Sequence, residues 1–124
     1  MASIDEMIRS FVATWNESNS AKRDLTIEKT WSPDGIYRNA TAEFGGYVGI
    51  ARAVTEAHDA FVANGFVFTL SNVDINHNAV RYRWEMLPAS GGEPDSIGTH
   101  MALVGTDGRL VSDYQFIDKA PSAS

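Results

Sequence analysis

The most constraining feature of the sequence is the segment 79–87, in which apolar and charged side chains alternate strictly from Val80 to Met86. The apolar positions are Val80, Tyr82, Trp84 and Met86, and charged side chains stand between them. A period of two is that of a strand with one buried and one exposed face. Such a strand belongs in an antiparallel sheet that is covered on one side only.

Three neighbouring segments are also predicted to be strands, namely residues 66–76, 97–104 and 109–118. Each is rich in β-branched or aromatic side chains. Short turn signals separate them: His77-Asn78, a Ser/Gly/Pro-rich loop over 88–95, and Asp107-Gly108, a strong hairpin signal. The second half of the chain is therefore predicted to be an antiparallel meander.

The first half of the chain supplies helices to cover that sheet. The predicted helices span residues 4–18, 21–31 and 50–63. Ser3 with Glu6 fits a capping box for the first, Ser20 could cap the second, and Gly65 suits the left-handed position after the third. Between them, residues 32–35 (Ser-Pro-Asp-Gly) predict a turn, residues 36–42 a strand, and residues 43–46 a loop or short hairpin. The predicted fold class is α+β, with helices packed on one face of the sheet.

Composition excludes several classes of function. The 124 residues suit one domain, expected over 1–119, with 120–124 as a disordered tail. The chain lacks cysteine, so thiolate metal sites and thiol nucleophiles are excluded. A net charge of −6 argues against nucleic-acid binding. The sequence shows neither a signal peptide nor an apolar membrane span, and we expect a cytoplasmic protein.

Cofactor and metal motifs are likewise missing from the sequence. The three histidines, His58, His77 and His100, are far apart in the chain, and no ligand spacing typical of a metal site occurs. The Gly-Gly pairs at 45–46 and 91–92 match no phosphate-binding loop, and no serine lies in a nucleophile-elbow motif. We therefore expect neither a cofactor nor a metal.

Several short motifs, in this order and spacing, resemble the SnoaL-like branch of the nuclear-transport-factor-2-like superfamily. They are Ala13-Thr14-Trp15-Asn16, the segment Trp31 to Tyr37, Gly49-Ile50, Arg81-Tyr82-Arg83-Trp84, Gly98-Thr99-His100 and Asp107 to Leu110. The resemblance implies a cone, with a strongly curved sheet around helices and an internal pocket. Members include ketosteroid isomerases, polyketide cyclases, epoxide hydrolases, dehydratases and non-catalytic binding modules, and many are dimers. The fold therefore implies a pocket without fixing a reaction.

Asp113 and His100 are the two candidate catalytic residues. Asp113 shares a predicted strand face with Val111, Gln115 and Ile117, where a partly buried carboxylate could act as a base or acid. The resemblance places acid–base residues on this strand, and the competing interpretation is a solvated or salt-bridged Asp113. His100 lies mid-strand, and the resemblance directs this position into the cone, where imidazole could partner the carboxylate. The competing interpretation is a core histidine.

Two positions depart from the enzymes of the superfamily. Asn39 stands where ketosteroid isomerases carry their general base, and an amide cannot abstract a proton. Gln115 stands where the hydrolase-type acid falls. These two residues disfavour the corresponding mechanisms but remain candidate polar pocket groups.

Other side chains are predicted to line the pocket. Tyr37 and Tyr82 could donate phenolic hydrogen bonds, and the predicted wall is Trp15, His58, Phe61 and Trp84. For each of them, ordinary core packing is the alternative.

The sequence and the resemblance together predict a binder of a small, mostly apolar organic molecule. The first hypothesis is a cofactor-free acid–base enzyme of isomerase, cyclase or dehydratase type. The alternative is a non-catalytic ligand-binding or dimerisation module. A homodimer is expected through the exposed sheet face, with Met101, Leu103, Tyr114 and Phe116 as candidate contacts.

Overall fold

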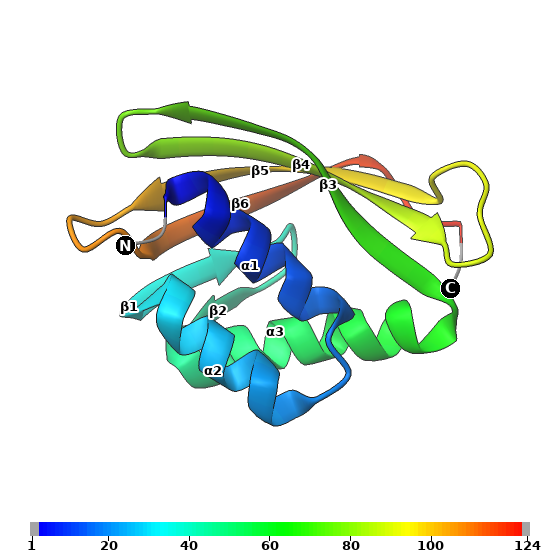
Figure 1. The fold of residues 1–124 in the computed structure, drawn as a ribbon, viewed down its shortest axis with the longest axis horizontal. Helices are drawn as coiled ribbons and strands as arrows, with labels where there is room; N and C mark the ends of the chain where they lie inside the picture. Colours follow the sequence, from blue (N-terminus) through cyan, green and yellow to red (C-terminus); the bar gives the residue numbers. More distant parts are fainter. Residues whose placement is uncertain (1–2, 123–124) are drawn as a thin grey trace.

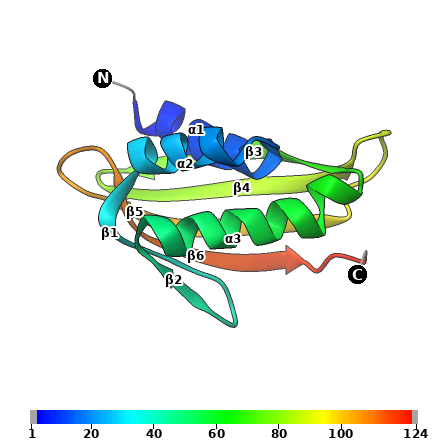
Figure 2. The same ribbon diagram turned by 90° about the horizontal axis from the view of Figure 1, so that it is seen from below.

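The computed structural model describes residues 3–122 of the chain. It has the predicted order of elements: two helices, two strands, a helix, and then four strands. Figures 1 and 2 show the three helices on the same side of the sheet. The α+β class with one-sided helical cover is therefore confirmed. No helix within residues 3–122 is long and apolar enough to cross a membrane.

The helices are α1 (Ile4–Asn16), α2 (Ser20–Thr30) and α3 (Gly46–Ala60), followed by the short 3-10 helix η1 (Val62–Asn64). Ser3 caps α1 as predicted, since its hydroxyl accepts the Glu6 N–H at 3.1 Å. The predicted cap of α2 is wrong, because Asn19 and not Ser20 accepts the Lys22 N–H, at 3.1 Å. Gly65 takes the predicted left-handed conformation with φ of 96°.

Six strands form one sheet in the order β2-β1-β6-β5-β4-β3. They are β1 (Trp31–Arg38), β2 (Glu43–Gly45), β3 (Phe66–Asn76), β4 (Ala79–Pro88), β5 (Ser96–Val104) and β6 (Leu110–Lys119). Strands β3 to β6 form the predicted antiparallel meander, and β1 joins it in parallel with β6.

Residues 32–35 do not form the predicted turn, which is a correction. They lie within β1, where the pairing with β6 shifts register between Trp31 and Ile36. Trp31 pairs with Leu110 and Ile36 pairs with Ser112, so the four residues between them bulge out opposite Val111 alone. Residues 43–46 likewise contain β2 and the first residue of α3, which begins earlier than the predicted position 50.

The predicted alternation of β4 is confirmed, because Val80, Tyr82, Trp84 and Met86 are all buried beneath the helices. Phe11 of α1 lies at the centre of this core, edge-on to Trp15, Trp31 and Tyr37. Val111 does not share the buried face of Asp113 on which the alternation placed it, and Leu25 is also exposed. Leu25 on α2 is 59% exposed, and Val111 on β6 is 37% exposed, because the β5–β6 register shifts beside it.

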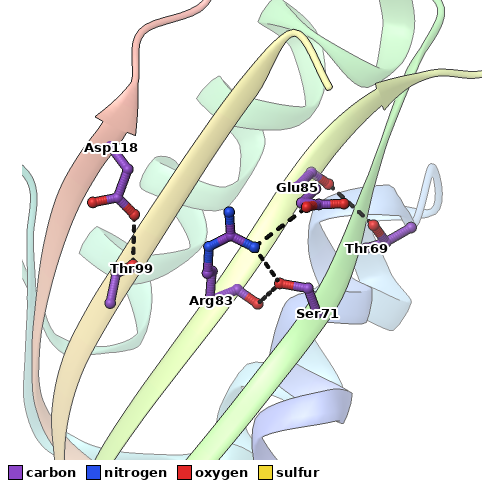
Figure 3. A network of polar contacts seen from close by, with 6 residues as sticks. All are labelled: Thr69, Ser71, Arg83, Glu85, Thr99 and Asp118. Carbon is purple, nitrogen blue, oxygen red and sulfur yellow. Dashed lines mark hydrogen bonds and ion pairs between the residues drawn. The ribbon is translucent and has the colours of Figure 1, made fainter. Parts of the chain in front are cut away.

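The face of the sheet that points away from the helices is divided into two parts. A polar part crosses β3 to β6, where Arg83 donates to Ser71 and Glu85, and Thr99 donates to Asp118 (Figure 3). An apolar part lies on β5 and β6, and its exposed side chains are Met101, Leu103, Val111, Tyr114 and Phe116. We call this second part the outer apolar patch.

The outermost long strand, β3, is tied to α1 through one side chain. The Asn16 amide donates to the Phe68 carbonyl at 2.7 Å, and its oxygen accepts the Phe68 N–H at 2.8 Å. Both backbone groups of Phe68 that would otherwise be unpaired at the sheet edge are therefore satisfied. This contact fixes where α1 lies on the sheet, and with it Trp15.

Candidate functional site

A cavity of about 380 Å³ opens between α3 and the inner face of the sheet. Its wall combines aromatic and aliphatic side chains with a few polar ones. The lining residues are Trp15, Tyr37, Asn39, Phe44, Ala53, Val54, Glu56, Ala57, Ala60, Phe61, Phe68, Trp84, Met86, Ser96, Gln115, Ile117 and Pro121. This composition is typical of a site for a small organic molecule.

The cavity includes six of the side chains that the sequence predicted for the pocket. They are Trp15, Tyr37, Asn39, Phe61, Trp84 and Gln115. Two others lie elsewhere. His58 does not line the cavity, because its Nδ1 lies 3.0 Å from the Trp15 carbonyl, which draws the ring towards α1. Tyr82 is fully buried behind the wall, because its hydroxyl donates to Asp113.

Asp113 and His100 contact each other, but both are enclosed by protein and do not face the cavity as the sequence-based hypothesis expected. Both are fully buried, and the Nδ1 of His100 lies 2.7 Å from one carboxylate oxygen of Asp113. The other carboxylate oxygen accepts the Tyr82 hydroxyl. Neither residue lines the cavity. His100 lies directly behind it, however, with ring centroids 5.6 Å from Trp15 and 5.8 Å from Tyr37, two lining residues.

The hydrogen-bond partners assign the protonation of this group. The Trp84 indole N–H can only donate, and it donates to the Nε2 of His100 at 2.9 Å. Nε2 therefore carries the lone pair, and Nδ1 carries the hydrogen donated to Asp113. Both oxygens of Asp113 accept hydrogen bonds, which is the arrangement of an ionised carboxylate. The result is a buried chain from Trp84 through His100 to Asp113, joined by Tyr82.

The charge of Asp113 acts on two neighbouring tyrosines. Burial raises the pKa of the Tyr82 hydroxyl well above its ordinary value, and the negative charge of Asp113 raises that pKa further. The same two causes raise the pKa of Tyr37. Both hydroxyls therefore keep their protons at neutral pH and act as hydrogen-bond donors.

One wall of the cavity carries a neutral polar pair. The Tyr37 hydroxyl donates to the Gln115 side-chain oxygen at 3.0 Å. The amide N–H groups of Gln115 donate to no other group among residues 3–122 and are free to meet a ligand's acceptor. Asn39 instead accepts hydrogen bonds from Thr41 and the Ala42 N–H, which is an ordinary turn arrangement at a strand end.

Sequence reasoning did not single out several lining residues. Met86 follows Trp84 on the buried face of β4, so the alternation alone could have placed it in the wall. Ser96 and Glu56 carried no such signal. The Ser96 hydroxyl donates to the Lys119 carbonyl at 2.8 Å, and Glu56 is an exposed residue of α3 at the edge of the apolar stripe. Within residues 3–122, no group of three or more His, Asp or Glu side chains could hold a metal ion.

Comparison with known proteins identifies the fold. No family model matches the sequence, and no curated protein matches it. A presumed isomerase of the SnoaL-like family from Agrobacterium tumefaciens superposes with a TM-score of 0.82 at 24% identity, over 91% of this chain and 95% of that one. A presumed polyketide cyclase from Sinorhizobium meliloti superposes with a TM-score of 0.64 at 19% identity, over 86% of this chain and 93% of that one. A third structure is a hypothetical protein from Catenulispora acidiphila with a ketosteroid isomerase-like fold, in complex with trimethylamine. It superposes with a TM-score of 0.68 at 13% identity, over 90% of this chain and 84% of that one. The chain thus has the SnoaL-like, nuclear-transport-factor-2-like fold.

Proposed function

We propose that this chain, which has the SnoaL-like fold, binds a small and mostly apolar organic molecule in its cavity and performs cofactor-free acid–base chemistry on it. The reaction would be of isomerase, cyclase or dehydratase type. The observation that carries this proposal is the position of His100. Its ring is paired with a buried carboxylate and lies directly behind three rings of the cavity wall.

The geometry favours His100 as the group that moves the proton, with Asp113 orienting it. Asp113 is enclosed by His100 and Tyr82, so its oxygens do not reach the cavity. The Nε2 of His100, by contrast, is separated from the cavity by the Trp84 indole alone along that hydrogen bond. This division of roles reverses the one favoured by the sequence.

In the proposed step, the Nε2 lone pair takes a proton from an acidic carbon next to a ligand carbonyl. The electron pair of the broken C–H bond moves towards the carbonyl oxygen, which the free amide N–H groups of Gln115 can stabilise. The charge of Asp113 stabilises the imidazolium that forms. The imidazolium then returns the proton, either to another carbon, which is isomerisation, or to a departing hydroxyl, which leaves as water.

Hydrogen exchange tests this step without knowledge of the natural substrate. A panel of small apolar ketones, with a tetralone as the first member, is incubated with the protein in heavy water. Proton loss from the carbon next to the carbonyl is then followed by NMR. We expect accelerated exchange that falls by about 100-fold or more in His100→Gln and Asp113→Asn. His58→Gln is the matched control, because His58 is also buried but lies outside the cavity wall.

The alternative function is non-catalytic binding in the same cavity. It is favoured by the hydrogen bonds of His100, because protein groups occupy both of its ring nitrogens. Ketones that bind, seen as shifts of the Trp15 and Trp84 signals, but show no faster exchange would support this alternative and overturn the enzyme proposal. Failure of every ketone to bind would overturn both functions.

We also propose that two copies associate through the outer apolar patch. The patch is flanked by the mixed charges of Arg83, Glu85 and Asp118, which can pair with their own counterparts across a two-fold axis. Phe116, 55% exposed, is its most exposed aromatic side chain.

Phe116→Glu is therefore expected to convert a dimer into a monomer, measured by light scattering across a concentration series. A charge placed in the middle of an apolar contact would be buried without a partner. Val48→Glu is the control, since Val48 is 83% exposed on α3, on the helical side. A wild-type protein that is monomeric at every concentration would contradict the proposal.

A further inference from the structure

The Trp84 indole rests directly on the backbone of Gly98. The two residues face each other across β4 and β5. A Cβ atom added to Gly98 would lie 2.4 Å from Cζ2, 2.5 Å from Cε2 and 2.9 Å from Nε1 of the indole. Real Cβ atoms do not approach that closely, so only glycine permits the indole to occupy this place. We call this contact the Gly98 seat.

On the Gly98 seat the indole reaches His100, which lies two residues further along β5 and on the same face. From there Nε1–H donates to Nε2 at 2.9 Å. The lone pair that the proposed proton transfer needs is thus already taken by a protein donor. Any ligand that uses this lone pair must first displace the indole N–H.

The indole has room to leave the seat, because Trp84 is itself part of the cavity wall. Its edge-on neighbours Trp15, at 5.9 Å, and Phe68, at 5.2 Å, are also wall residues. A turn of the Trp84 side chain would move the indole into space that a ligand shares. The hydrogen bond to His100 and the occupant of the cavity are therefore in competition.

We propose that Trp84, held on the Gly98 seat, is a positioning residue that occupies the Nε2 acceptor of His100 until the hydroxyl of a ligand replaces the indole N–H. Apolar molecules that carry a phenol, enol or alcohol hydroxyl can make this replacement at Nε2, whereas the same molecules without a hydroxyl leave the bond between Trp84 and His100 in place. This inference rests on the proposed binding function for its ligand, but the contact between Trp84, Gly98 and His100 can be tested without a ligand.

The first experiment measures the reactivity of His100 with diethyl pyrocarbonate, which acylates an available imidazole nitrogen. The reaction is followed at each histidine by mass spectrometry of peptides. Gly98→Ala should push the indole off its seat, and Trp84→Phe should remove the N–H donor. We expect His100 to react about tenfold faster in both variants, because a competing hydrogen bond is lost. Gly45→Ala is the matched control, since an added Cβ there has nothing within 4 Å.

Two other histidines show whether the effect is local. His77 is exposed on a turn and His58 is buried beside Trp15. Both should react at the wild-type rate in every variant. An unchanged His100 rate in Trp84→Phe, or a parallel rise at His58 that indicates a loosened fold, would overturn the inference. Should Gly98→Ala fail to fold, Trp84→Phe alone decides.

The second experiment compares naphthol with the matching methylnaphthalene, which has the same shape but lacks the hydroxyl. We expect naphthol to bind about fivefold more tightly. Naphthol alone should shift the Trp84 indole N–H resonance and the His100 ring nitrogen resonances. The preference should grow in Trp84→Phe, because the hydroxyl then meets a free Nε2 and no N–H has to be displaced. Equal binding of the two probes, or binding without those shifts, would overturn the ligand preference. Absence of binding by either, with the reactivity result intact, would count against the proposed function and not against the contact.

Discussion

Replacing Asp113 with alanine is expected to lower the free energy of unfolding by about 3–5 kcal/mol. Asp113 is fully buried and accepts hydrogen bonds from His100 and Tyr82. Its loss leaves an imidazole N–H and a phenol O–H without partners in the core, and each such donor costs about 1–3 kcal/mol. Urea unfolding of the two proteins measures the difference. Asp113→Asn should cost less, because its amide oxygen still accepts one of the two bonds.

A double-mutant cycle separates this cause from simple loss of packing. In a Tyr82→Phe background the phenol O–H no longer exists, so Asp113→Ala leaves only the imidazole N–H of His100 without a partner. We expect Asp113→Ala to cost about 1–2 kcal/mol less in that background than in the wild type. Costs that simply add would show that the hydroxyl does not depend on the carboxylate, contrary to the observed contact.

Phe11→Ala is expected to lower the free energy of unfolding by about 3–5 kcal/mol. Phe11 is fully buried, with ring centroids 5.7 Å from Trp15, 5.5 Å from Trp31 and 6.1 Å from Tyr37. Removing the ring opens a void against three large side chains that cannot all close over it. Urea unfolding again supplies the measurement.

Phe11→Ala should also change the shape of the cavity, since Trp15 and Tyr37 belong to its wall. We expect the ketone affinity to fall together with stability. Leu25→Ala, on the exposed face of α2, should change stability by about 0.5 kcal/mol at most. A similar loss in the two variants would show that Phe11 is not the centre of the core.

The elements that the sequence predicts well are those with a strong local pattern. The alternation from Val80 to Met86 fixes which face of β4 is buried, and the capping box of Ser3 and Glu6 marks where α1 begins. The juxtaposition of His100 and Asp113 also follows, because the Asp107-Gly108 hairpin pairs their two strands. The observed fold confirms these features.

Long-range pairing decides the features that the sequence does not predict. The Pro33-Asp34-Gly35 segment has every local mark of a turn, yet it lies within β1, as a bulge between two residues that pair with β6, Trp31 and Ile36. His100 is shielded from the cavity by Trp84, and this depends on how the side chains of these two residues pack between β4 and β5. A glycine within the apolar strand 97–104 was the available signal, since such a residue often marks a close approach.

The contact between Asn16 and Phe68 bears on how copies of this protein can meet. An outermost strand can accept a strand from another chain wherever its peptide groups are unpaired. The Asn16 side-chain amide gives Phe68 one donor and one acceptor, as a residue of a neighbouring strand would. Helix α1 therefore replaces a seventh strand at this one residue of β3. Edge-to-edge addition of another strand at Phe68 is thus blocked by the protein's own helix α1.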